Sequence, residues 1–216
     1  MNTNRKYAAC GIAGGALIML ANIMIHIGGS ITGENPDTGW TSVSNMLFGI
    51  SEFIALVGAV GSLMGCISTH HTAAETCGKK MKVLSLLPIV GIVGMPLFHG
   101  NINCIEPLIY QVLDKHGQQS IYGDMDSIIS SSFAPADLLI LVTFYSQLIV
   151  LFYGVLSGRF GVKKWFLIFD PIVFLIIGAV ISSILPASVS GIGLGMRNLG
   201  EGLMYIIPFA YRKNRA

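Results

Sequence analysis

Long apolar runs separated by short polar segments dominate the chain. A helix needs about 20 apolar residues to cross the hydrocarbon of a bilayer, and six runs are close to that length. They are Tyr7–Gly28, Met46–Ser68, Val83–Asn103, Ala136–Ser157, Trp165–Leu185 and Ser190–Tyr211. The pattern predicts an all-α, polytopic transmembrane helix bundle with six spans in one membrane domain, residues 1–216.

The polar separators differ in character. Thr69–Lys82 is polar and basic, whereas Ile105–Pro135 is long and contains several aspartates. Within the latter, Pro107–Leu113 is apolar enough to lie on the outer membrane interface but too short to span. We interpret Ser127–Ser132 as a serine-rich linker.

Composition agrees with lipid as the solvent. Hydrophobic residues make up 53% of the chain and charged residues 11%, with a mean hydropathy of +0.70. A soluble domain carries about 25% charged residues, so this chain has too little polar surface to coat a globule in water.

The basic residues alternate with the apolar runs. With the N-terminus inside, the inner segments hold eleven Lys and Arg residues and the outer segments hold only Lys115, while Arg197 lies within the sixth run. This asymmetry satisfies the positive-inside rule and predicts a cell-membrane protein with both termini cytoplasmic. We expect no nucleic-acid binding, because the membrane boundary already explains the basic residues. The first run lacks a clear cleavage site, so we expect a retained helix rather than a signal peptide.

Small residues and prolines mark the expected helices. Glycines at four-residue spacing let membrane helices approach closely, and these pairs are Gly11/Gly15, Gly61/Gly65 and Gly191/Gly195. Prolines within the runs remove backbone hydrogen bonds and favour kinks; they are Pro88, Pro96, Pro171 and Pro208.

Ionisable residues inside the apolar runs are the candidate functional residues. A charge at the bilayer centre costs about 2.5–3.5 kcal/mol on insertion scales, so such residues usually face a partner or a wet cavity. An outer group comprises His26, Glu52, His99 and Asp137, with the amide of Asn103 at the end of the third run and Glu106 just beyond it. A deeper group comprises Asp170, Arg197 and Glu201.

Each candidate also has a structural interpretation. Arg197 and Glu201 are four residues apart, a spacing that permits an ion pair and could only lock helices together. Asp137 could cap a helix that starts at Ala136. Asp170 could snorkel or pair with a neighbouring lysine. Glu52 has no basic neighbour in sequence and needs a proton or a partner from another helix.

No metal or cofactor is predicted. The two histidines and two carboxylates of the outer group could suit zinc, but no HxxxH or HExxH spacing supports such a site. The four cysteines form no CxxC pair, and we expect no disulfide.

The last third of the chain resembles a known family. Lys163–Pro171 contains an aromatic run followed by Asp170-Pro171, and Gly195–Gly200 carries glycines followed by Asn-Leu. These features are similar to a family of small bacterial multi-pass membrane proteins of unknown function, in which asparagine is commoner at the position of Asp170. The resemblance implies a topology and a bacterial source, but no chemistry.

Three functions remain open. The chain could bind or transport a small molecule or ion through its intramembrane polar residues. It could be a membrane enzyme that performs acid–base chemistry on a lipid-soluble substrate. It could also be an accessory subunit whose polar residues are all paired with one another. The lipid bilayer is the one partner that the sequence itself requires, and the oligomeric state is open.

Overall fold

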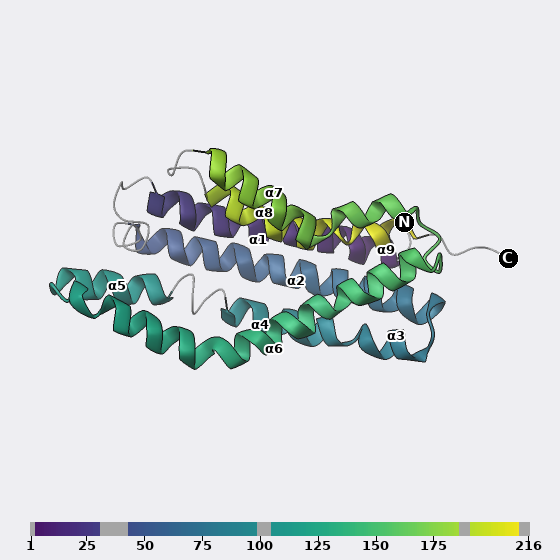
Figure 1. The fold of residues 1–216 in the computed structure, drawn as a ribbon, viewed down its shortest axis with the longest axis horizontal. Helices are drawn as coiled ribbons and strands as arrows, with labels where there is room; N and C mark the ends of the chain where they lie inside the picture. The colour runs from purple at the N-terminus through teal and green to yellow at the C-terminus, as the bar shows by residue number, and fades with distance from the viewer. Residues whose placement is uncertain (1–2, 31–42, 99–104, 186–190, 212–216) are drawn as a thin grey trace.

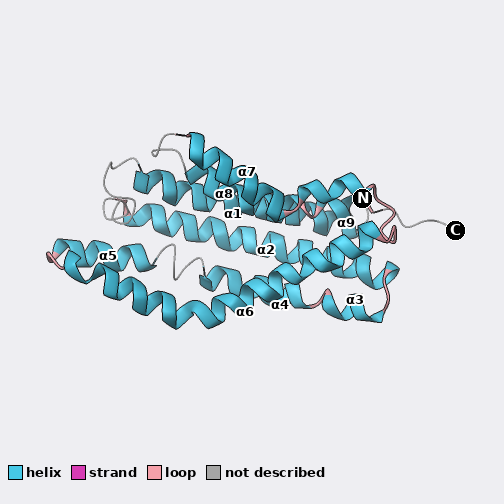
Figure 2. Ribbon diagram, viewed as in Figure 1, coloured by secondary structure: helices cyan, strands magenta, loops and turns pink. Residues whose placement is uncertain are grey.

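The computed structural model describes residues 3–30, 43–98, 105–185 and 191–211. Within these ranges the regular structure is helical and no strand occurs, which confirms the all-α fold class (Figure 2). The elements are α1 (Thr3–Ser30), α2 (Asn45–Thr76), α3 (Lys79–Leu84), α4 (Leu87–Phe98), α5 (Glu106–Lys115), η2 (Gln119–Ile121), α6 (Tyr122–Leu156), η3 (Lys164–Phe169), α7 (Pro171–Ile184), α8 (Gly191–Leu203) and α9 (Ile206–Ala210).

The chain runs back and forth along the long axis of an elongated bundle. Helix α1 leads away from the N-terminal end, α2 returns, α3 and α4 lead away, α6 returns, α7 leads away, and α8 and α9 return (Figure 1). Helix α9 lies beside the start of α1, where the Arg5 guanidinium sits 5.8 Å from the centre of the Phe209 ring. Both described chain ends therefore lie at one end of the bundle, which we call the terminal end.

Two of the expected helices are interrupted before a proline. Pro88 and Pro208 lack an N–H, so the carbonyl oxygens four residues earlier, at Leu84 and Met204, lose their α-helical donors. The backbone tightens there into three-residue bonds, from Leu86 N to Val83 O at 3.0 Å and from Ile207 N to Met204 O at 3.2 Å. The predicted third and sixth helices therefore consist of α3 with α4 and α8 with α9.

The fifth expected helix starts later than predicted. Residues Lys164–Phe169 form the 3-10 helix η3, and α7 begins at Pro171. Proline is well suited to the first helical position, because its missing N–H would have no intrahelical partner there. The expected kink at Pro171 is therefore a helix start.

The long outer segment was predicted wrongly. Helix α6 begins at Tyr122, so the expected linker Ser127–Ser132 is helical and Pro135 lies inside the helix. The first residue of this helix contacts α5. The Tyr122 hydroxyl donates to Tyr110 O at 3.1 Å, and the two rings lie 4.9 Å apart.

Glycines set the closest helix contacts, as their spacing predicted. A methyl group on Gly11 would lie 2.6 Å from Gly65 Cα, and one on Gly61 would lie 2.7 Å from Cys10 O. A methyl group on Gly15 would collide with the backbone of Gly202. Helix α1 therefore packs backbone to backbone against both α2 and α8.

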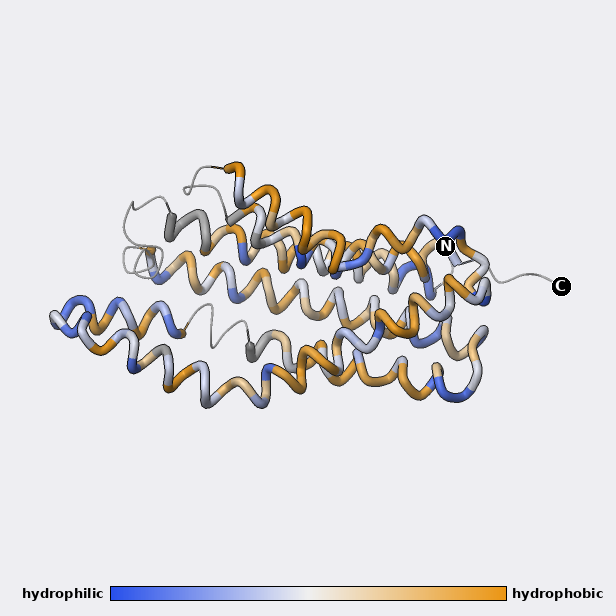
Figure 3. Tube along the Cα trace, in the orientation of Figure 1, coloured by the Kyte–Doolittle hydropathy of each residue, from blue (hydrophilic) through white to orange (hydrophobic). Residues whose placement is uncertain are grey.

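The bundle is apolar on its outside. Large hydrophobic side chains are exposed along α2, α4, α6 and α7, while serine, threonine, asparagine, glutamine and glutamate side chains are buried. Hydrophobic residues predominate along these helices (Figure 3). Three candidate spans are long and apolar enough to cross a membrane: Thr3–Ile25, Asn45–Thr76 and Gln119–Leu156. The shorter Pro171–Ile184 is also apolar.

Candidate functional site

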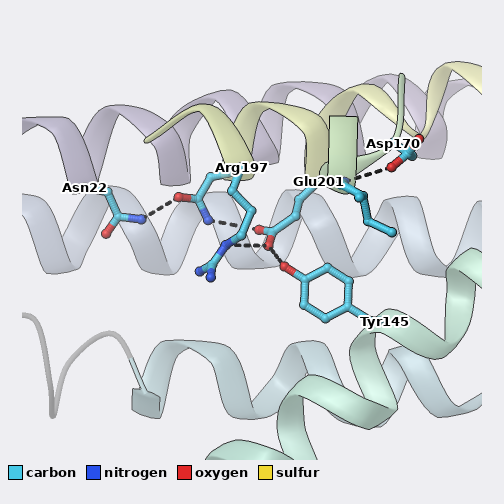
Figure 4. A network of polar contacts seen from close by, with 7 residues as sticks. Asn22, Tyr145, Asp170, Arg197 and Glu201 are labelled. Atoms are coloured by element: carbon cyan, nitrogen blue, oxygen red, sulfur yellow. Dashed lines mark hydrogen bonds and ion pairs between the residues drawn. The ribbon is translucent and has the colours of Figure 1, made fainter. Parts of the chain in front are cut away.

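A buried glutamate joins three helices in the middle of the bundle. Glu201 of α8 is 2% exposed. Its carboxylate accepts a hydrogen bond from the Tyr145 hydroxyl of α6 and another from Asn198 Nδ2 at 2.9 Å (Figure 4). Asn198 Oδ1 in turn accepts from Asn22 Nδ2 of α1 at 2.7 Å. We call Asn22, Tyr145, Arg197, Asn198 and Glu201 the Glu201 network.

Arg197 provides the opposite charge. Its Nε lies 3.4 Å from Glu201 Oε1, so the ion pair that the spacing permitted is present. The approach is within charge contact but outside hydrogen-bond geometry, because Nε makes no hydrogen bond among the described residues. The Arg197 side chain is 40% exposed, whereas that of Glu201 is 3% exposed. The pair is thus a buried anion beneath an accessible cation.

Helical spacing and one close helix contact build this arrangement. Residues three and four positions apart share a helix face, so Arg197, Asn198 and Glu201 gather on one turn of α8. The approach of Gly15 to Gly202 brings α1 close enough to α8 for Asn22 to reach Asn198. Hydrogen bonds to a charged group stabilise it by about 1.5–3 kcal/mol each, which offsets part of the cost of burying the carboxylate.

A second buried polar group lies one turn further along the same face. The Tyr205 hydroxyl is 3.2 Å from Cys66 Sγ, which donates to Gln147 Oε1 at 3.8 Å. The Tyr205 ring fills the slot left by the missing side chain of Gly65. All three side chains are buried, and Gln147 Nε2 has no hydrogen-bond partner in the described part of the chain.

Asp170 has a different place. Its carboxylate is the N-cap of α7 and accepts from Ile172 N at 2.7 Å and from Val173 N at 3.2 Å. It is 5% exposed. The Asp170 side chain thus caps its own helix. The sequence had suggested snorkelling or a lysine partner for Asp170, and not capping.

The predicted outer group is only partly among the described residues. His99 and Asn103 lie outside them, as does the side chain of His26. Glu52 is half-buried on α2, and Glu106 begins α5 and accepts a hydrogen bond from Tyr110 at 2.9 Å. Asp137 is half-buried in the middle of α6, so the prediction that it caps a helix starting at Ala136 was wrong.

Sequence reasoning found only part of the Glu201 network. The i, i+4 pair was visible on one helix, whereas Tyr145 reaches it, and Asn22 reaches Asn198, from other helices. Amides inside apolar runs, such as Asn22 and Gln147, were the available signal. Among the described residues, no group of three His, Cys, Asp or Glu side chains is placed to hold a metal ion.

In the residues that the structure describes, the fold and the network define a helical protein with helices able to cross a membrane and a charge pair on one helix whose glutamate is buried. The chain belongs to a family of unknown function (DUF6796), which matches residues 1–215. No curated protein and no solved structure matches the chain. An uncharacterised family was expected from the last third, and the match extends it over almost the whole sequence.

Proposed function

We propose that the chain crosses the bacterial cell membrane six times, with both termini in the cytoplasm, and binds a small molecule or ion at the Glu201 network. The topology is supported by the course of the chain and by its charges. The segments that carry Arg5, Lys79–Lys82, Arg159 and Lys164 lie at the terminal end, and α5, which ends at Lys115, lies at the opposite end (Figure 1). One basic end is what the positive-inside rule requires.

The single observation that carries the binding function is the charge pair of Arg197 and Glu201. Burying a carboxylate in an apolar bundle is costly unless it is paired and hydrogen-bonded. A pair that only locked helices would be enclosed on both sides. Here the Arg197 side chain remains 40% exposed, so the pair presents a charged group to whatever enters from outside the bundle.

The other functions fit less well. An accessory subunit whose polar groups only hold helices together should enclose its charge pair, yet the Arg197 side chain is 40% exposed. An enzyme with acid–base chemistry should bring a histidine and a carboxylate together. The Glu201 network contains a glutamate but no histidine. Binding is also the first step of transport, so the two share this site.

Thermal unfolding in dodecyl maltoside tests the proposal. The probes are sodium ion, inorganic phosphate, glycerol and phosphatidylglycerol, added to the wild type, Glu201→Gln and the control Glu75→Gln. Glu75 is a suitable control because it is exposed near the terminal end, where its carboxylate accepts a hydrogen bond from the Tyr211 hydroxyl at 3.2 Å, away from the Glu201 network. We expect at least one probe to raise the melting temperature of the wild type and the control but not of Glu201→Gln. Equal responses of all three proteins, or no response to any probe, would reject binding at this network.

A further inference from the structure

One side of the Arg197 guanidinium contacts Glu201, and the other side is accessible. Guanidinium carries five N–H donors in a planar fork. In Arg197, Nε faces the Glu201 carboxylate at 3.4 Å. The carboxylate is itself held by Tyr145 and Asn198. The terminal nitrogens point away from Glu201 and Tyr145 (Figure 4), and no hydrogen bond or ion pair joins them to the described residues.

We infer that the outward-facing nitrogens of Arg197 bind an oxyanion, a phosphate or carboxylate group carried by the ligand. The inference rests on the proposed function and names the class of its ligand. A planar guanidinium matches two oxygens of such a group with two parallel hydrogen bonds. The charge contact with Glu201 at 3.4 Å keeps the guanidinium near this position before the ligand arrives, which reduces the entropy lost on binding.

The different exposure of Arg197 and Glu201 indicates that the ligand is an anion rather than a cation. The Glu201 side chain is 3% exposed, and donors from Tyr145 and Asn198 already occupy its oxygens. A cation that approached the site would meet Arg197 first and be repelled. An anion would meet an accessible positive charge with unused donors.

The position along α8 suggests two sources for the oxyanion. Arg197 is six residues beyond Gly191, the first residue of α8, or about 9 Å along the axis. An arginine side chain at this depth can reach the headgroup region. A phospholipid headgroup and a free anion both offer the required chemistry.

Binding measurements on the full-length protein distinguish the two sources. The wild type, Arg197→Gln, Arg197→Lys and the control Lys164→Gln are titrated in dodecyl maltoside with phosphatidylglycerol, phosphatidylcholine or inorganic phosphate. Lys164 is an exposed cation at the terminal end, so its loss removes a charge without touching the site. Thermal stabilisation reports the affinity.

We expect Arg197→Gln to weaken anion binding at least tenfold, the usual scale of a charge-assisted pair. The anion affinity of Arg197→Lys should lie between those of the wild type and Arg197→Gln, because lysine offers a point charge without the planar fork of donors. A response to phosphate indicates a free anion, and a response to phosphatidylglycerol alone indicates a headgroup; either supports the inference. If Arg197→Gln does not fold, the double variant Arg197→Gln/Glu201→Gln is measured in its place, because it leaves no unpaired buried charge.

The inference fails if the wild type responds to neither anionic probe, or if Arg197→Gln or its double-variant replacement responds as the wild type does. Its failure is separable from that of the proposed function. A stabilisation by sodium ion or glycerol that requires Glu201 would keep the network as a binding site while excluding an oxyanion ligand.

Discussion

Tyr145 illustrates how a carboxylate is retained inside an apolar bundle. Its hydroxyl donates to Glu201 from a helix that is distant in sequence. Together with Asn198 it supplies the donors that water would give an exposed carboxylate. The network therefore depends on groups whose only sequence signature is a polar atom inside an apolar run.

Removing the Tyr145 hydroxyl should destabilise the protein. We expect Tyr145→Phe to lower the free energy of unfolding by about 1.5–3 kcal/mol, because the carboxylate loses a charge-assisted hydrogen bond. Unfolding by sodium dodecyl sulfate in mixed micelles measures the change. Tyr153→Phe on the same helix is the control, since Tyr153 is 37% exposed. Equal losses for the two variants would mean that the bond to Glu201 contributes nothing.

Gly15 offers a second test at this scale. Gly15→Ala should lower the free energy of unfolding by about 1–3 kcal/mol, because its methyl group would push α1 away from Gly202. Gly49→Ala should instead stabilise the protein by about 0.5–1 kcal/mol, because nothing lies within 4 Å of the added methyl group and alanine favours helix. Thermal unfolding of both variants measures the contrast. A neutral Gly15→Ala would argue against the tight contact between α1 and α8.

Helix ends explain several features at the scale of the element. The Asp170-Pro171 pair is an N-cap followed by proline at the first helical position, the preferred order at a helix start. Asparagine caps helices as well as aspartate does. The capping role accounts for Asp170 without any proton transfer.

Capping predicts a specific mutational pattern. Asp170→Ala should lower the free energy of unfolding by about 1 kcal/mol, since Ile172 N and Val173 N lose their acceptor. Asp170→Asn should stay within a few tenths of a kcal/mol of the wild type. Chemical unfolding of both variants measures the difference. If Asp170→Asn were as damaging as Asp170→Ala, the charge rather than the cap would be what α7 requires.

The element boundaries show where sequence reasoning succeeded and failed. Apolar runs located the helices, because burial in lipid requires continuous apolar length. The breaks before Pro88 and Pro208 followed from their missing N–H groups. The start of α6 at Tyr122 was not predicted, because the serines and aspartates before Pro135 suggested a loop. In the structure this stretch is helical, and the first residue of α6, Tyr122, contacts Tyr110 of α5.

The arrangement of the whole molecule depends on contacts that no single segment contains. Arg197 and Glu201 were predicted as a pair because one helix carries both. Their connection to Asn22 and Tyr145 requires α1, α6 and α8 to meet, which depends on glycine contacts between helices. Spacing within a run shows which residues share one side of a helix, but it does not show which other helix packs against that side.

Reporter fusions test the proposed topology of the whole chain. Alkaline phosphatase fused after Gly117, beyond the third crossing, should be active in a bacterial host because the enzyme folds only outside the cytoplasm. Fusion after Gly161, beyond the fourth crossing, should give an inactive enzyme, and green fluorescent protein should give the reverse pattern. The same reporter result at both positions would exclude a crossing by α6.

The length of α6 has a consequence at the surface of the cell. Its 35 residues extend about 52 Å, whereas the hydrocarbon of a bilayer is about 30 Å thick. In the proposed topology, roughly 20 Å of helix emerges on the outer side and carries α5 with it. In that topology the helical hairpin stands above the membrane, where an antibody or a neighbouring cell-envelope protein could contact it.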